Sequence, residues 1–212
     1  SWLNPLKDLS LLGNRGGSLP ERVAEKALQF LGLAYLEGME SLDGSGLLSE
    51  LVEGLKAKEL AQLCRFFWTL RRKAEPSARA SKILMFWMKV AKQVRVNRAG
   101  APELQSALGQ LAVFVHELTP DAVEALVDAA PHAQVRHHGD ILVQNLARLA
   151  SQYPKEVAKI FRAAMSGFLP DYRKEDVIEC VTRLADAGEV EEAEWICNAY
   201  AERGSTLLKE TY

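Results

Sequence analysis

Apolar residues recur at helical spacing along most of this chain. Early in the sequence, for example, they fall at Val23, Ala27, Phe30, Leu31 and Ala34, which fits the 3.6-residue period of an α-helix. No stretch shows the alternation of β-branched and polar residues that a half-buried strand needs. The pattern therefore predicts an all-α protein.

The prolines indicate where the helices begin. At the first helical position a proline loses nothing, because the N–H of that residue has no partner within the helix. Thr119, directly before Pro120, is a suitable cap. Seven of the eight prolines occupy such positions: Pro5, Pro20, Pro76, Pro102, Pro120, Pro154 and Pro170. With the glycine breaks they predict about ten helices. The apolar stretches are 5–12, 23–34, 47–55, 58–70, 76–95, 102–118, 120–130, 135–152, 154–167, 173–187 and 190–203, of which 47–55 and 58–70 are either two helices or one kinked helix.

The spacing of the helix starts indicates how the helices are arranged. From Pro102 onward a new helix begins about every 16–20 residues, so a two-helix unit has about 34–40 residues, within the range of known helical repeats. This favours antiparallel helix pairs stacked as a right-handed α-solenoid, or an irregular helical array, over a four-helix bundle. We expect residues 1–212 to form one domain, and a subdivision would fall at the break near residues 97–101.

Two stretches resemble known helical proteins. Leu-Ala-Asp-Ala-Gly-Glu-Val-Glu-Glu-Ala at 184–193 resembles the helix–glycine–helix junction of tetratricopeptide repeats, and the unit length also suits HEAT repeats. Tyr-Pro-Lys-Glu-Val-Ala at 153–158, with the hairpin from Cys180 to Gly204, resembles the C-terminal helical regions of large multidomain bacterial proteins. In those proteins an effector or nucleotide-hydrolysing module precedes a helical sensing array. The resemblance implies a fragment of a longer protein, in agreement with a first residue other than Met.

The net charge of −2 conceals a strongly basic middle segment. Residues 56–98 hold twelve Lys or Arg and two acids, and both flanks are acidic. Helical spacing places some of the bases on common faces, and those we expect to contact a partner are Arg65, Arg72, Arg79, Lys82 and Lys89. Such a face would attract an acidic protein or a phosphate backbone. Two other interpretations are a solvated face whose long stems cover apolar surface, and a surface that docks on the acidic flanks or on another subunit.

The remaining residues give no sign of catalysis. His137 and His138 point about 100° apart on a helix, so they are poorly placed to share a metal ion. Cys180 and Cys197 flank Gly188 on the two arms of the last hairpin, where we expect buried free thiols. Three scattered cysteines favour a reducing, cytoplasmic location, and no apolar run approaches the roughly 20 residues that cross a bilayer.

The sequence therefore predicts a non-enzymatic helical-repeat domain that acts as a binding or scaffold surface. Its partner would be another protein or a neighbouring domain of a larger intracellular bacterial protein. We expect no catalytic residue, metal or cofactor. The alternative is a nucleic-acid-binding module that uses the basic face of residues 56–98.

Overall fold

The chain folds into helices, as the hydrophobic pattern predicts. The computed structural model describes residues 21–38, 46–71, 77–94, 102–112, 119–135, 139–165, 173–206 and 208, and in these ranges it contains ten α-helices, a short 3-10 turn and no strand. The predicted helix at 5–12 and the break at 97–101 lie outside the described residues. The helices are α2 Glu21–Leu36, α3 Leu47–Gly54, α4 Ala57–Arg71, α5 Ser77–Gln93, α6 Pro102–Ala112, α7 Pro120–Ala129, η2 Ala130–His132, α8 Gly139–Leu149, α9 Pro154–Met165, α10 Lys174–Asp186 and α11 Val190–Glu202.

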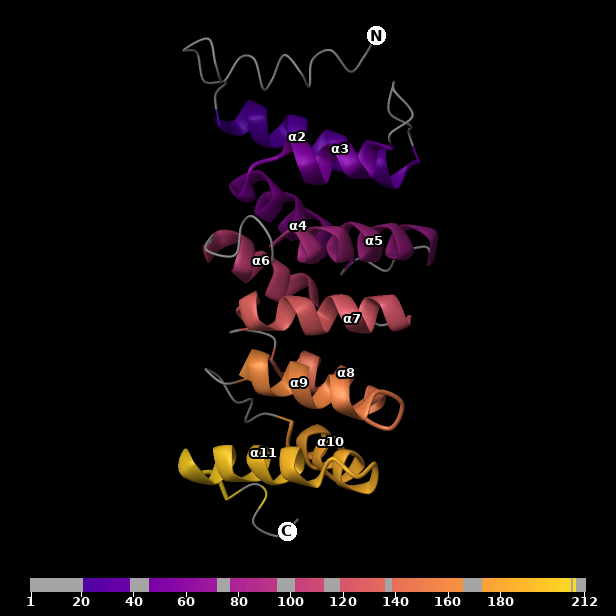
Figure 1. Ribbon diagram of the computed structural model, residues 1–212. Helices are drawn as coiled ribbons and strands as arrows, with labels where there is room; N and C mark the ends of the chain where they lie inside the picture. The colour runs from indigo at the N-terminus through magenta and orange to yellow at the C-terminus, as the bar shows by residue number, and fades with distance from the viewer. Residues whose placement is uncertain are drawn as a thin grey trace.

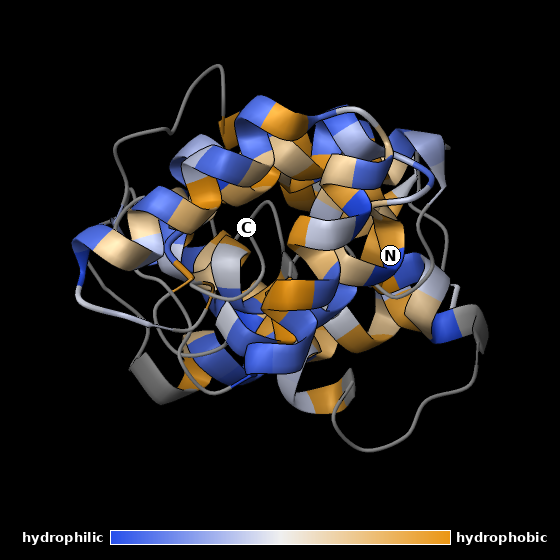
Figure 2. Cartoon of the chain, turned by 90° about the horizontal axis from the view of Figure 1, so that it is seen from below, coloured by the Kyte–Doolittle hydropathy of each residue, from blue (hydrophilic) through white to orange (hydrophobic). Residues whose placement is uncertain are grey.

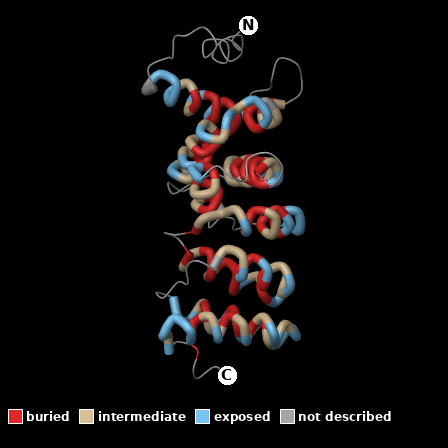
Figure 3. Tube along the Cα trace, turned by 60° about the vertical axis from the view of Figure 1, so that its left-hand side comes forward, coloured by how far each residue is buried: buried red, intermediate tan, exposed pale blue. Residues whose placement is uncertain are grey.

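The helices follow one another along a single axis, with α2 and α3 at one end and α10 and α11 at the other (Figure 1). They form two rows. In the first, α4 packs between α2 and α6, and further along α8 packs on α10. In the second, α3, α5, α7, α9 and α11 pack one on the next. The column is therefore two helices thick, which Figure 3 shows from the side.

One continuous hydrophobic core runs through the column, from Leu28 to Leu208. Hydrophilic and hydrophobic residues are mixed along the helices (Figure 2), as expected of amphipathic helices. The buried stripe of α5 contains Ile83, Trp87 and Val90. The Trp87 indole Nε1 donates a hydrogen bond to the Leu108 carbonyl over 3.2 Å, which joins α5 to α6. No helix in the described ranges is long and apolar enough to cross a membrane.

Local signals set several helix ends correctly, but the predicted start at residue 135 is wrong, because Val135 is not helical and α8 begins at Gly139. Pro102, Pro120 and Pro154 are each the first residue of a helix, and the Thr119 hydroxyl accepts a hydrogen bond from the Ala122 N–H over 3.3 Å. Gly188 has a φ of +90° and separates α10 from α11. That left-handed conformation is unfavourable for other residues. Pro5, Pro20, Pro76 and Pro170 lie outside the described residues.

In α2, the buried residues differ from the apolar stripe that the sequence predicts. Two of its apolar residues are largely in solvent, with exposed fractions of 48% for Val23 and 64% for Phe30. The buried side instead carries Leu28, Leu31 and Tyr35. The Tyr35 hydroxyl donates a hydrogen bond to the Lys82 carbonyl of α5 over 2.7 Å. Helix α2 is apolar on more than one side, and its neighbours decide which side is buried.

Net charge alternates in sign along the second row. Helix α3 has two acids and no base, α5 four bases and no acid, α7 three acids and no base, α9 three bases and one acid, and α11 four acids and no base. Ion pairs link α3 with α5 and α9 with α11. Lys89 Nζ lies 3.9 Å from Glu53 Oε1, and Arg162 Nη2 lies 2.8 Å from Glu192 Oε2. Because successive helices of this row carry opposite net charge, the alternation is favourable for the observed stacking order.

Candidate functional site

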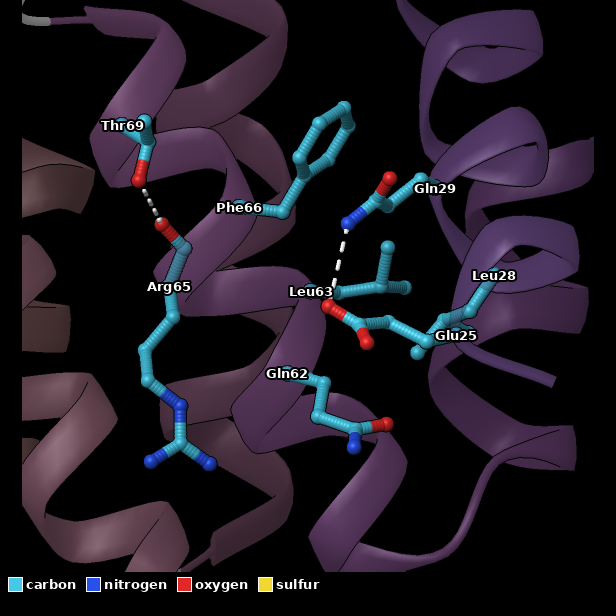
Figure 4. A pocket seen from close by; sticks show the side chains of 8 residues that line it. All are labelled: Glu25, Leu28, Gln29, Gln62, Leu63, Arg65, Phe66 and Thr69. Atoms are coloured by element: carbon cyan, nitrogen blue, oxygen red, sulfur yellow. Dashed lines mark hydrogen bonds between the residues drawn. The ribbon is translucent and has the colours of Figure 1, made fainter. Parts of the chain in front are cut away.

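A groove lies between α2 and α4 at the N-terminal end of the column (Figure 4). It encloses about 390 Å³ and is open to solvent. Its apolar lining is Leu28 from α2 with Leu63 and Phe66 from α4. Its polar lining is Glu25 and Gln29 from α2, with Gln62, Arg65 and Thr69 from α4.

Gly32 determines how closely α2 and α4 approach one another. A Cβ added to Gly32 would lie 3.0 Å from Leu63 Cδ2, 3.0 Å from Phe67 Cε1 and 3.3 Å from Phe66 Cδ1. Side chains of α4 thus pack directly on this buried glycine, and a larger residue there would force them to shift. Leu28, one turn earlier, and Glu25 line the groove. The groove lies next to the contact at Gly32, in the direction of the N-terminus of α2.

The polar groups of the groove come from both walls. Figure 4 shows Glu25 and Gln29 on one helix and Gln62 on the other, with the Arg65 guanidinium directed away from α2. Gln29 Nε2 donates to Glu25 Oε1 over 3.3 Å, and the Thr69 hydroxyl donates to the Arg65 carbonyl over 3.0 Å. Two amides and one carboxylate above an apolar floor are suited to non-covalent recognition.

The five basic residues expected to contact a partner do not all lie in this groove. Arg72 is outside the described residues, and Arg65 lines the groove. The other three belong to α5 and bind α2 or α3. Arg79 forms an ion pair with Glu37, Lys82 Nζ donates to the Leu36 carbonyl over 2.8 Å, and Lys89 donates to the Ser49 hydroxyl.

These contacts divide the basic segment between two places. Arg65 lines a groove that includes Glu25, whereas Arg79 pairs with Glu37. Those two acids are separated by about 18 Å along α2, at 1.5 Å per residue. The α5 bases contact residues of the acidic N-terminal flank, which corresponds to the interpretation in which the basic segment docks within its own chain. Of the expected contacts that the structure describes, Arg65 is the one in the groove.

Lys82 is expected to contribute to stability through its contact with the end of α2. Replacing it with methionine keeps the apolar stem but removes the charged hydrogen bond to the Leu36 carbonyl. We expect Lys82→Met to lower the free energy of unfolding by about 1–2 kcal/mol, measured by urea denaturation. Lys92→Met, at an exposed position of the same helix, is the matched control and should change it by less than about 0.5 kcal/mol. Equal effects of the two substitutions would contradict a structural role for Lys82.

The cysteines are expected to differ in reactivity. All three are free. Burial raises the pKa of the Cys64 and Cys180 thiols to about 12, and it also raises the pKa of the half-buried Cys197. Only the thiolate is nucleophilic, so at pH 8 an aromatic disulfide reagent should modify Cys197 alone in the folded chain. Cys64 and Cys180 should react only after a denaturant is added. Fast native reaction that persists in Cys197→Ser would contradict this burial.

The described ranges contain no cluster of three His, Cys, Asp or Glu side chains that could bind a metal ion. His137 and His138 lie outside these ranges. Comparisons of the chain with protein-family models, characterised proteins and solved structures found no match. The candidate site is therefore identified from its geometry alone.

Sequence reasoning identified Arg65 but missed the amides and the acid of the groove. Glu25, Gln29 and Gln62 look like ordinary solvated helix positions, and nothing in their spacing connects α2 with α4. The one local signal was Gly32, because glycine in a helix interior costs stability and often indicates a close approach.

Proposed function

We propose that this chain is a non-enzymatic α-helical repeat domain that binds a protein partner through the groove between α2 and α4. The observation that carries the proposal is the groove itself, with hydrogen-bonding and charged groups from two helices above an apolar floor. Binding sites in proteins commonly combine such a floor with a few polar groups that orient the ligand.

The packing order supports a repeat architecture. Most helices contact the helix two places further along the chain, and several successive helices, such as α8 with α9 and α10 with α11, contact one another between rows. Stacked two-helix units of an α-solenoid, including those of tetratricopeptide and HEAT type, are built from such neighbour contacts. Solenoids generally use an extended surface to hold other proteins. A scaffold role within a larger intracellular bacterial protein is consistent with this architecture.

The charges favour a protein over a nucleic acid as the partner. The groove has an acid, Glu25, on one wall and a base, Arg65, on the other. A nucleic-acid site needs a continuous basic surface, yet Arg79 and Lys89 are paired with acids of the same chain. The balance of charge in the groove matches a polypeptide, which carries both signs.

Peptide selection on the full chain tests this proposal. We expect the chain to retain peptides from a displayed random library. Gln62→Trp, which fills the groove, should weaken a selected peptide at least about tenfold, equivalent to about 1.4 kcal/mol. The binding constant is measured by fluorescence anisotropy with a labelled synthetic peptide.

The matched control is Gln144→Trp, which places the same ring at a half-buried glutamine of α8. It should leave the affinity unchanged. Equal loss in both variants, or loss in the control alone, would contradict a site between α2 and α4. Retardation of DNA or RNA at low salt that Arg65→Glu abolishes would instead support the nucleic-acid alternative.

A further inference from the structure

The groove between α2 and α4 is short and lies between converging helices. Its residues cover 62–69 on α4, a length of about 10 Å at 1.5 Å per residue. Beside it, at Gly32, the two helices are in contact. A length of about 10 Å takes about three residues of an extended chain, at about 3.3 Å per residue.

The amides of the groove also match an extended chain. Gln29 and Gln62 stand on opposite walls, and each amide offers two N–H donors and a carbonyl acceptor. Gln29 uses one N–H toward Glu25, which leaves its second N–H and its carbonyl for a ligand. A helix satisfies its own backbone groups, whereas an extended segment presents N–H and C=O groups that need partners. Amides on both walls therefore favour an extended segment.

The charges indicate the composition of that segment. Leu28, Leu63 and Phe66 provide room for one apolar side chain. Glu25 lies on the α2 wall and, within the described part of the chain, has no ion-pair partner, whereas the Arg65 guanidinium is directed away from α2 (Figure 4). Successive side chains of an extended chain point to opposite sides, so a residue seated on the floor has neighbours directed toward the rim.

We infer that the groove binds an extended peptide segment in which one apolar residue is flanked by a basic residue beside Glu25. This inference rests on the proposed function and names the ligand of the same groove.

Selection from a displayed library of random peptides tests the inference, with the full chain as bait. We expect the retained peptides to share an apolar residue with a base next to it. Circular dichroism of the synthetic consensus peptide should show no helix, and a proline beside the motif should be tolerated. Glu25→Lys should weaken this peptide about threefold to tenfold, and selection against that variant should replace the base by an acid.

Charge exchange provides the sharper test. The variant Glu25→Lys should regain wild-type affinity for a peptide in which the base beside position 25 is replaced by an acid. Glu124→Lys, at an exposed position of α7, is the control and should change neither affinity nor preference. Some retained peptides could lose affinity for the Gln62→Trp variant and yet be helical, or show no charge preference. That result would overturn the inference and leave the proposed function standing. No retained peptide at all would overturn the proposed function as well.

Discussion

Replacing Gly109 with alanine is expected to lower the free energy of unfolding by about 3 kcal/mol or more, at the upper end for overpacking. An added Cβ would lie 2.7 Å from the carbonyl carbon of Gln134 and closer still to its oxygen. That backbone is held in place, because the Gln134 N–H donates to the Gln105 carbonyl over 3.1 Å. Helix α6, which contains Gly109, and the segment after η2 would have to separate. The midpoint of urea unfolding and the melting temperature measure the loss.

Gly54→Ala is the matched control for this substitution. Gly54 is the last residue of α3, and an added Cβ there meets nothing within 4 Å. Alanine in a helix is favoured over glycine by up to about 1 kcal/mol, so the variant should be equally or slightly more stable. A Gly109→Ala chain as stable as the wild type would contradict the close packing of α6 on the segment after η2.

Replacing Trp87 with alanine is expected to have the other large effect, a loss of about 3–5 kcal/mol. Trp87 is among the largest fully buried side chains, on the face of α5 turned to the core. Its removal leaves a cavity between the rows and also deprives the Leu108 carbonyl of its 3.2 Å hydrogen bond. Thermal unfolding followed by far-ultraviolet circular dichroism measures the change.

Trp87→Phe separates the effect of the cavity from the effect of the lost hydrogen bond. Phenylalanine keeps most of the apolar volume but cannot donate to the Leu108 carbonyl, so a loss of about 1–3 kcal/mol is expected. Trp195→Ala, at a half-buried position of α11 where the ring lies under Arg162 at 4.4 Å, should cost less than Trp87→Ala. The opposite order would contradict the placement of Trp87 in the core.

The helices were predictable because their signals are local. The cap at Thr119, the first-turn prolines and Gly188 each act within a few residues of a helix end. The burial of α2 was less predictable. Val23 and Phe30 are exposed while Leu28 and Tyr35 are buried, a choice that depends on which side α4 and α5 cover.

The candidate site was predictable only in part, for a related reason. The sequence places Arg65 on a basic helix face, but the partners of Lys82 and Arg79 are 46 and 42 residues away along the chain. Contacts over such separations follow from the packing of α5 on α2 and α3, which a helix pattern does not specify. The groove depends in the same way on the contact at Gly32. Residue types alone indicate charge, and the fold decides which charges face solvent.

The position of a bound peptide tests the central claim most directly. Backbone amide resonances of the isotope-labelled full chain would be followed by nuclear magnetic resonance while a selected peptide is added. The account predicts that the largest shifts fall on residues 25–32 of α2 and 62–69 of α4, and that α8 to α11 stay unchanged. Shifts concentrated on α8 to α11, with α2 and α4 unaffected, would contradict the account.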